Sequence, residues 1–361
     1  MDIQSYTLED LESHLSLSTA NSNAVWPLSP LRVSSYVNNP RAEKTDCVLF
    51  ELRMEEKLVA YRTLLPDCYF DLDGKPHPFA WLSGNWVDPS FRRQGLSTKL
   101  LQQAEAHWEG RLMYTNYAPA SKAVYDRTGQ FPLLTRREGR RFYLRAANEE
   151  LLGERLGSKK LLRTGDQLIN TLRKSRLQKF PHVDPDQCKV ELLTGLDTRL
   201  ALRISQWQEQ SLFRRGETEF SWVLNNPWVT SKKVAPLNYH FSYGSDRFEN
   251  ILVKFSLPDQ SIGLAWLVLH NQSLSIPYLF VENEEIYPFM ATEVIHRMVT
   301  QGCSYATVRS PLLVQYLMKH QNVFLTTRNL PQQIFAHKLI SAQIPQNKTI
   351  HDGDGDVVFT G

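Results

Sequence analysis

Residues 79–97 read Phe-Ala-Trp-Leu-Ser-Gly-Asn-Trp-Val-Asp-Pro-Ser-Phe-Arg-Arg-Gln-Gly-Leu-Ser. The first part is mostly apolar and rich in aromatic residues, which predicts a β-strand over 79–87. Proline has no N–H for a strand ladder, so this strand should end at Asp88-Pro89. After the loop, apolar residues recur at helical spacing from Leu96 to Trp108 and predict a helix. The stretch is therefore expected to form a strand, a short basic loop and a helix.

The loop between this strand and helix has the features of a phosphate-binding site. Arg92 and Arg93 bring positive charge, and Gly95 lets the backbone approach a ligand because it has no Cβ. The start of a helix adds free N–H groups and the positive end of the helix dipole. Ser97 is small enough to cap the first turn or to bond a ligand oxygen. These features favour a phosphate-containing ligand over the alternative, a basic turn that binds nothing.

The order Val87-x-Pro89-x-x-Arg92-Arg93-Gln94-Gly95-Leu96-Ser97 resembles the acyl-CoA loop of the GNAT superfamily of N-acetyltransferases. The family pattern is Val-x-Pro-x-x-Arg/Gln-x-x-Gly-x-Gly/Ala, and Ser97 is the one departure from it. The resemblance implies that the loop binds the pyrophosphate of acetyl-CoA and that the neighbouring strand backbone pairs with its pantetheine amides. The expected cofactor-binding residues are Trp86, Val87, Arg92, Arg93, Gln94, Gly95, Leu96, Ser97, Thr98 and Ser121.

A second stretch, Ser121-x-x-x-Tyr125-x-x-x-Gly129-x-Phe131, lies on and after a helix predicted from Pro119 to about Thr128. It resembles the second GNAT motif, in which a small residue lies near the CoA arm and a tyrosine faces the thiol. The resemblance implies that Tyr125 is the catalytic proton donor to the leaving thiolate of CoA. The alternative is a core aromatic residue with a bonded hydroxyl. Ala118 stands where many family members carry Asn, which puts one cofactor hydrogen bond in doubt.

The transfer of an acetyl group also needs a group that accepts the amine proton and an N–H donor for the oxyanion. Glu51, Asp88 and His77 are candidate bases, but each is more often a structural residue, and ordered water is the alternative. The strand at 79–87 would supply the N–H donor if a bulge at Ser83-Gly84-Asn85 splays it from its neighbour.

The second half of the chain repeats the first in outline. Ser34-x-x-Val37-Asn38-Asn39-Pro40 recurs as Ser221-x-x-Leu224-Asn225-Asn226-Pro227, and each copy precedes a predicted strand hairpin, at 47–65 and at 250–270. A strand, a helix, a strand and a helix follow in both halves. The sequence thus predicts an α/β fold with mixed sheets, made of two GNAT-like acyl-CoA N-acyltransferase domains in tandem.

The expected boundaries give an N-terminal GNAT domain with the acetyl-CoA loop (1–146), a basic helical connector (147–185) and a degenerate C-terminal GNAT-like domain (186–361). A hairpin at 133–146 would complete the first domain, and strands at 322–328 and 354–359 would complete the second.

The second domain carries Val281-Glu-Asn-Glu-Glu-Ile-Tyr-Pro288 where the loop would stand. Its three carboxylates would repel a pyrophosphate, so no CoA is expected there. The expected role of this domain is to cover the substrate side of the first or to form the surface of a homodimer. Asp352-Gly-Asp-Gly-Asp356 resembles the opening of a calcium loop but has no later Glu, and it predicts a turn.

Composition limits the class of partner. A net charge of +3 over 361 residues gives no argument for nucleic acid, and the basic connector is expected to be a solvated helix face rather than an RNA surface. The four cysteines are far apart, which fits a reducing compartment and no metal site. The polar N-terminus does not resemble a signal peptide, and no apolar run reaches membrane-spanning length. A cytoplasmic protein with no membrane partner is expected.

Together these features predict an N-acetyltransferase that moves an acetyl group from acetyl-CoA directly to a primary amine, carried by a small molecule or a peptide. One alternative is a FemABX-like aminoacyl transferase, which the intact CoA loop argues against. The other is a non-catalytic acyl-CoA-binding sensor or scaffold, in which Tyr125 would have no chemical role. The sequence does not identify the acceptor amine.

Overall fold

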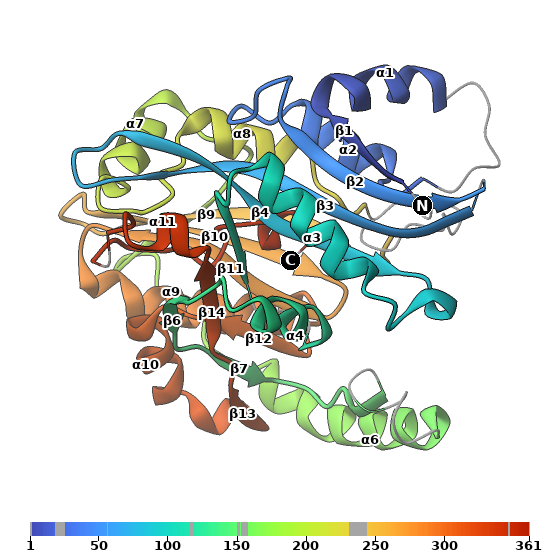
Figure 1. The fold of residues 1–361 in the computed structure, drawn as a ribbon. Coiled ribbons are helices and arrows are strands. Elements are labelled where there is room, and N and C mark those ends of the chain that lie inside the picture. Colours follow the sequence, from blue (N-terminus) through green and yellow to red (C-terminus); the bar gives the residue numbers. More distant parts are fainter. Residues whose placement is uncertain are drawn as a thin grey trace. The chain divides into compact units, whose positions relative to one another are not determined.

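The structure, a computed structural model, describes residues 2–18, 26–55, 57–115, 119–149, 152, 158–230, 244–345 and 347–360 (Figure 1). It is a mixed α/β fold with two seven-stranded sheets. The chain forms two compact units. Unit 1 comprises Met1–Arg136, Leu196–Asp246 and Gln332–Thr360, and unit 2 comprises Arg137–Gly195 and Arg247–Pro331.

Unit 1 contains the sheet with strand order β1-β2-β3-β4-β5-β14-β6. Its strands are β1 (Ile3–Thr7), β2 (Cys47–Met54), β3 (Lys57–Phe70), β4 (Pro76–Val87), β5 (Leu112–Thr115), β14 (Gln332–Ala336) and β6 (Leu133–Arg137). Its helices are α1 (Leu8–Ser18), α2 (Pro30–Val37), α3 (Leu96–His107), α4 (Pro119–Thr128), α7 (Thr198–Trp207), α8 (Glu217–Asn225) and α11 (Lys338–Ser341), with short 3-10 helices at Pro89–Phe91 and Val357–Phe359. The predicted hairpin at 47–65, strand at 79–87 and helix from Leu96 are confirmed.

The core of unit 1 explains why α3 forms where the apolar spacing predicted it. Leu96, Leu100, Leu101 and Ala104 are buried along one face of the helix and pack with apolar residues of β2, β3 and β4. Each leucine buried in this way contributes about 1.5–3 kcal/mol. The position of the loop before α3 is therefore fixed by the core on one side and by β4 on the other.

Unit 2 contains the sheet with strand order β13-β7-β12-β11-β10-β9-β8. Its strands are β13 (Thr326–Asn329), β7 (Arg140–Tyr143), β12 (Tyr305–Val308), β11 (Ser273–Val281), β10 (Ile262–His270), β9 (Phe248–Ser256) and β8 (Lys189–Leu193). Its helices are α6 (Lys159–Leu177), α9 (Tyr287–Thr300) and α10 (Pro311–Lys319), with 3-10 helices at Glu284–Ile286 and Gln321–Val323. The order β11, α9, β12, α10 matches the order β4, α3, β5, α4 of unit 1. The predicted repetition of elements is therefore present.

The predicted hairpin at 133–146 is wrong, because its two strands belong to different sheets. β6 lies at the edge of the sheet of unit 1, whereas β7 lies between β12 and β13 in unit 2. In the same way, β13 lies in unit 2 and β14 pairs with β5 in unit 1. The residues thus group differently from the boundaries expected at 1–146, 147–185 and 186–361.

The two residues that link β6 and β7 pack against the residue that follows β13. Leu330 N donates to Gly139 O at 2.8 Å, and a Cβ on Gly139 would lie 2.8 Å from the carbonyl oxygen of Leu330. Glu138-Gly139 therefore does not form the hairpin turn expected there. The strand expected at 354–359 is also wrong. These residues form turns and the 3-10 helix Val357–Phe359, and they belong to unit 1.

The repeated Asn-Asn-Pro segments lie side by side in unit 1, at the ends of α2 and α8. Asn38 Nδ2 donates to Asn226 Oδ1 at 3.2 Å, and Trp222 Nε1 donates to the carbonyl of Ser35 at 2.7 Å. The repeat therefore brings its two helices together within one unit. β1, which precedes both helices, was not expected from the sequence.

Candidate active site

Among the described residues, β4 pairs with β5 only near the middle of the strand. On one side it pairs with β3 up to Ala60↔Val87. On the other side, the described residues pair with β5 only at Ala80↔Leu112 and Trp81↔Met113. Backbone N–H and C=O groups beyond Trp81 are thus available to an extended ligand that enters between the two parallel strands.

A β-bulge lies at the point where the strands diverge. Thr63 faces Gly84, whereas Leu64 faces Leu82, so Ser83 is an extra residue in β4. Gly84 N donates to Thr63 Oγ1 at 2.8 Å and thus has a side-chain partner within the bulge. A bulge increases local twist and turns a strand away from its neighbour. The bulge predicted at Ser83-Gly84-Asn85 is confirmed.

The basic loop between β4 and α3 is exposed to solvent. Arg92, Arg93, Gln94 and Gly95 are all exposed, and Arg93 and Gly95 have left-handed φ angles of +66° and +78°. No atom lies within 4 Å of the place where a Cβ of Gly95 would stand. No side chain caps the first turn of α3 from this position. The loop thus leaves a helix start and two arginines accessible to an anion.

The remaining loop residues are placed by their neighbours. Leu96 is buried in the core and Thr98 is half-buried in the first turn of α3. Trp86 and Val87 are half-buried at the end of β4, and the Trp86 ring stacks on Tyr61 at 5.7 Å. The structure thus brings the end of β4 and the start of α3 together, as the sequence predicted for the cofactor loop.

Ser97 is held by two polar side chains from the sheet. Asn85 Nδ2 donates to Ser97 Oγ at 2.8 Å. Arg62, on β3, approaches the carbonyl and the hydroxyl of Ser97 at 3.4 and 3.5 Å. Ser97 therefore links the loop to the sheet, which is a structural role that the sequence did not predict for it.

Arg62 also contacts the predicted catalytic residue. Its Nη1 donates to Tyr125 Oη at 2.9 Å, and its Cζ lies 5.4 Å from the centre of the Tyr125 ring. The Arg62 side chain is fully buried. Because the arginine donates to the phenol oxygen, the phenol proton is directed toward another acceptor. Sequence reasoning missed Arg62, since a single arginine in a strand gives no local signal of burial.

Tyr125 lies in an aromatic cluster at the end of α4. Its ring centre lies 4.1 Å from that of Tyr114 and 5.7 Å from that of Phe131, and the residue is 4% exposed. Packing therefore fixes the ring, while the hydroxyl has a charged partner. Ser121 lies half-buried one turn earlier on α4. Ala118 is outside the described residues.

The three candidate bases are each bonded to local partners. Glu51 accepts hydrogen bonds from Tyr6 at 2.8 Å and from Arg53 at 2.9 Å. The other two form pairs at 2.8 Å, Asp88 with Lys57 and His77 with Asp71. The bond from Lys57 holds the pKa of Asp88 below its usual value, and the bond from His77 lowers the pKa of Asp71. Each of the three candidate bases is thus already bonded to a neighbouring side chain.

A polar cluster occupies the other face of the sheet at the bulge. Arg32, on α2, donates through Nη2 to Thr63 Oγ1 at 2.9 Å and to Ser83 Oγ at 2.8 Å. Its guanidinium lies 4.0 Å from the ring centre of Trp228. Ser83 Oγ in turn donates to a carboxylate oxygen of Asp356. Sequence reasoning missed this cluster, because its members are far apart in the chain.

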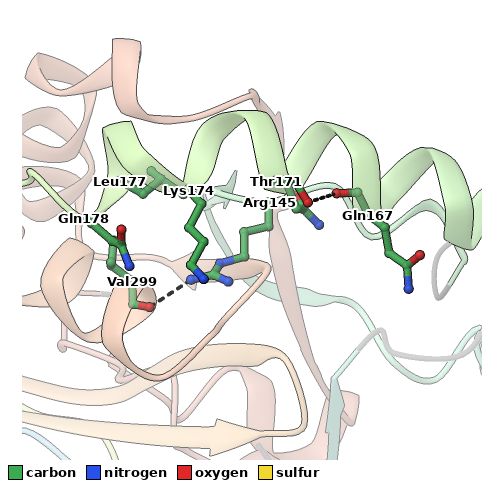
Figure 2. Close-up of a pocket in the computed structure, with 8 residues that line it drawn as sticks. Arg145, Gln167, Thr171, Lys174, Leu177, Gln178 and Val299 are labelled. Atoms are coloured by element: carbon green, nitrogen blue, oxygen red, sulfur yellow. Dashed lines mark hydrogen bonds between the residues drawn. The ribbon is translucent and has the colours of Figure 1, made fainter.

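Unit 2 has a pocket of about 440 Å³ beside α6 (Figure 2). Figure 2 shows Arg145 and Lys174 reaching into it, and Arg145 donates to the carbonyl of Val299 at 2.8 Å. Val299 lies in the last turn of α9, where a cation is favoured by the helix dipole. The pocket contains none of the predicted site residues. Within the described residues, no group of three His, Cys, Asp or Glu side chains could hold a metal ion.

The family model described as Acetyltransferase (GNAT) family matches residues 11–130, which run from α1 to just beyond α4 and include β4, the loop and α3. Residues 11–130 are thus similar to the GNAT acetyltransferases, which supports an acyltransferase activity for the protein. A search of curated protein sequences finds no match to the chain.

Solved structures resemble the chain well beyond residues 11–130. A conserved protein from Enterococcus faecalis V583, described as a probable N-acyltransferase, has a TM-score of 0.53 at 8% identity, with 94% of this chain and 73% of that chain covered. Saccharomyces cerevisiae N-myristoyltransferase with bound myristoyl-CoA has a TM-score of 0.51 at 10% identity, with 93% and 82% covered. At these identities the likeness concerns the fold alone, and it extends over both units. None of the helices in the described part of the chain could span a membrane.

Proposed function

We propose that the protein transfers an acetyl group from acetyl-CoA directly to a primary amine, with the reaction centre in unit 1. The observation that carries this proposal is the divergence of β4 from β5 directly before an open, basic helix start. An acyl-CoA has an extended amide arm, which suits the unpaired edge of β4. It also has a pyrophosphate, which suits the start of α3.

In this proposal the cofactor-binding residues divide into two groups. The backbone of Trp86 and Val87 pairs with the pantetheine amides, and Ser121 lies near the arm. The pyrophosphate binds at the helix start, where the arginines supply charge and Gly95 admits close contact. The residues assigned to the pyrophosphate loop are Arg92, Arg93, Gln94, Gly95, Leu96, Ser97 and Thr98.

The chemistry follows from the divergence of the strands and from Tyr125. The neutral amine attacks the thioester carbonyl, and an N–H of β4 beyond Trp81 stabilises the oxyanion. The C–S bond then breaks, and Tyr125 donates its proton to the thiolate. Arg62 holds the tyrosine oxygen through its own N–H, so that the phenol proton can point toward the sulfur. No covalent enzyme intermediate is required.

The acceptor is a small molecule or a peptide with a primary amine, and the reaction is placed in the cytoplasm. Cys47, Cys68, Cys188 and Cys303 are free thiols, which fits a reducing compartment. The acidic segment 281–288 lies at the corresponding place in unit 2, so one CoA is expected to bind per chain.

The test is a thermal-shift titration with acetyl-CoA, CoA and longer acyl-CoAs on wild type and on Gly95→Glu. A ligand that binds only the folded state raises the Tm with concentration. Gly302→Glu is the matched control, because Gly302 also has a left-handed φ, of +72°, and open space around its missing Cβ. We expect acetyl-CoA to shift wild type and the control but not Gly95→Glu.

No shift of wild type with any CoA would overturn the cofactor assignment. A screen of amines with a free-thiol readout then measures turnover. Binding without turnover of any amine or of water would favour the acyl-CoA sensor instead of the enzyme.

A further inference from the structure

The bulge of β4 is joined to the C-terminal segment of the chain by a chain of polar contacts. Arg32 Nη2 donates to Ser83 Oγ at 2.8 Å, and Ser83 Oγ donates to Asp356 Oδ2. Ser83 is the extra residue that creates the bulge. Asp356, the last residue of the acidic turn 352–356, is thus held directly beside the point where β4 leaves β5.

This cluster and Tyr125 lie on opposite faces of the sheet. Arg62 and Thr63 are neighbours on β3, so their side chains point to opposite sides. Arg62 bonds to Tyr125, whereas Thr63 accepts a hydrogen bond from Arg32. The face of Tyr125 carries α3 and α4, and the face of Asp356 carries α2. A thioester bound between β4 and β5 would therefore have Tyr125 on one face of the sheet and Asp356 on the other.

Asp356 combines a carboxylate with a setting that suits proton transfer. The side chain is half-buried. Burial raises the pKa of Asp356 above its usual value, although the bond from Ser83 and the charge of Arg32 act against this rise. A carboxylate with a raised pKa is a stronger base at neutral pH.

Charged and titratable groups of α2, β3 and the C-terminal segment lie around Asp356. From α2 the cluster includes Arg32 and Tyr36, and Arg32 also interacts electrostatically with the buried Tyr61 of β3. On its own segment, Asp354 accepts from the backbone N–H of His351 and pairs with a buried arginine at 3.8 Å. Arg32 is thus the cation that faces Asp356, and it reaches the carboxylate through Ser83.

The geometry points to Asp356 as the general base that takes the proton of the acceptor amine on the α2 face of β4. This inference rests on the proposed function. The amine nitrogen forms the bond to the acetyl carbon, its N–H proton passes to Asp356, and the C–S bond breaks as the sulfur takes the proton of Tyr125. Asp356 then releases its proton to solvent, and Tyr125 regains one from solvent. Overall, the amine gains the acetyl group and loses a proton, and CoA leaves as the free thiol.

The test compares wild type, Asp356→Asn and Ser83→Ala by free-thiol release from acetyl-CoA between pH 5 and 9. The acceptor probes are spermidine, glucosamine and a tripeptide, with water as the acceptor when none of them reacts. Asp259→Asn is the control, because Asp259 is an exposed carboxylate in a turn of unit 2.

We expect Asp356→Asn to lower kcat by about 10²-fold, as loss of a general base does, and to leave the KM for acetyl-CoA unchanged. The acid limb of the kcat profile should disappear in this variant. Ser83→Ala keeps the carboxylate but loses its hydrogen bond, so its acid limb should move to higher pH. The control should match wild type.

The thermal shift with acetyl-CoA separates the possible failures. If wild type neither binds acetyl-CoA nor releases thiol, the proposed function is wrong. If wild type is active and Asp356→Asn keeps both its kcat and its acid limb, the base assignment is wrong. An Asp356→Asn variant that also loses the acetyl-CoA shift would show a structural role and overturn the inference as well.

Discussion

Arg62 occupies an energetically costly position in the candidate site. Its guanidinium is fully buried, its Nε has no hydrogen-bond partner, and no carboxylate in the described chain lies within ion-pair distance of it. Arg62 lowers the pKa of Glu105, although burial raises that pKa overall. Burying an unpaired charge costs several kcal/mol, so a role beyond packing is expected. Its bond to Tyr125 supplies such a role.

We predict that Arg62→Met lowers kcat while the Tm stays unchanged or rises. Methionine fills a similar volume, and loss of an unpaired buried charge does not destabilise the fold. The loss in kcat should be about 10-fold or more, and Arg62→Lys should recover part of it. Because Arg62 acts through Tyr125, the double variant with Tyr125→Phe should lose no more than Tyr125→Phe alone. Additive losses in that cycle would contradict the positioning role.

Among the elements, β4, the loop and α3 could be predicted from sequence because each has a local cause. The apolar run, Pro89 and Gly95 act on their own neighbours, and the bulge at Gly84 is a local property of one strand. The placement of β7 in the sheet of unit 2 and of β14 in the sheet of unit 1 has no such local cause. Glu138-Gly139 has the composition of a hairpin turn, but Gly139 packs against Leu330, which is distant in sequence. Asp356 was missed for the same reason, since its partner Ser83 is distant in sequence.

In the link between β6 and β7, we predict that Gly139→Ala destabilises unit 2. The new Cβ would lie 2.6 Å from Arg309 Cγ and 2.8 Å from the carbonyl oxygen of Leu330. The Arg309 side chain can move, but the Leu330 oxygen belongs to the backbone that links β13 to β14. Overpacking of this kind costs about 1–3 kcal/mol.

The measurement for this link is amide hydrogen exchange of β7 and β13 together with the Tm. Gly195→Ala is the control, because nothing lies within 4 Å of its missing Cβ. Unchanged protection of both strands in Gly139→Ala would show that the link can turn elsewhere, and the placement of β7 would then not depend on this glycine.

At the scale of the whole molecule, unit 1 is assembled from three separate segments of the chain, and a buried ion-pair cluster joins them. Asp67 belongs to the first segment, Arg215 to the second and Asp354 to the third. Arg215 Nη2 lies 2.8 Å from Asp67 Oδ2, and its Nε lies 3.8 Å from Asp354 Oδ1. Arg41 Nη1 lies 2.6 Å from the other Asp67 oxygen. The segment that carries Asp356 is thus tied to the sheet that carries β4.

Asp67 should therefore make the stability of unit 1 sensitive to acid. Burial alone would raise its pKa, but the charges of Arg215 and Arg41 outweigh this and hold the pKa below its usual value. A lowered folded-state pKa stabilises the fold at pH values above the unfolded pKa of about 3.9. This stabilisation is lost as the pH falls through the folded-state pKa. Wild type should thus keep its full contribution from Asp67 at pH 7 and lose it below about pH 4.

We predict that Asp67→Asn lowers the free energy of unfolding of unit 1 by about 3–5 kcal/mol at pH 7, because two buried arginines each lose one of their charged partners. Between pH 7 and pH 3 the Tm of the variant should fall less than that of wild type. Asp73→Asn, in the exposed turn before β4, is the control and should follow wild type. A variant with the wild-type Tm at pH 7 would mean that the three segments are held by apolar packing alone. The position of Asp356 beside the bulge would then not depend on this cluster.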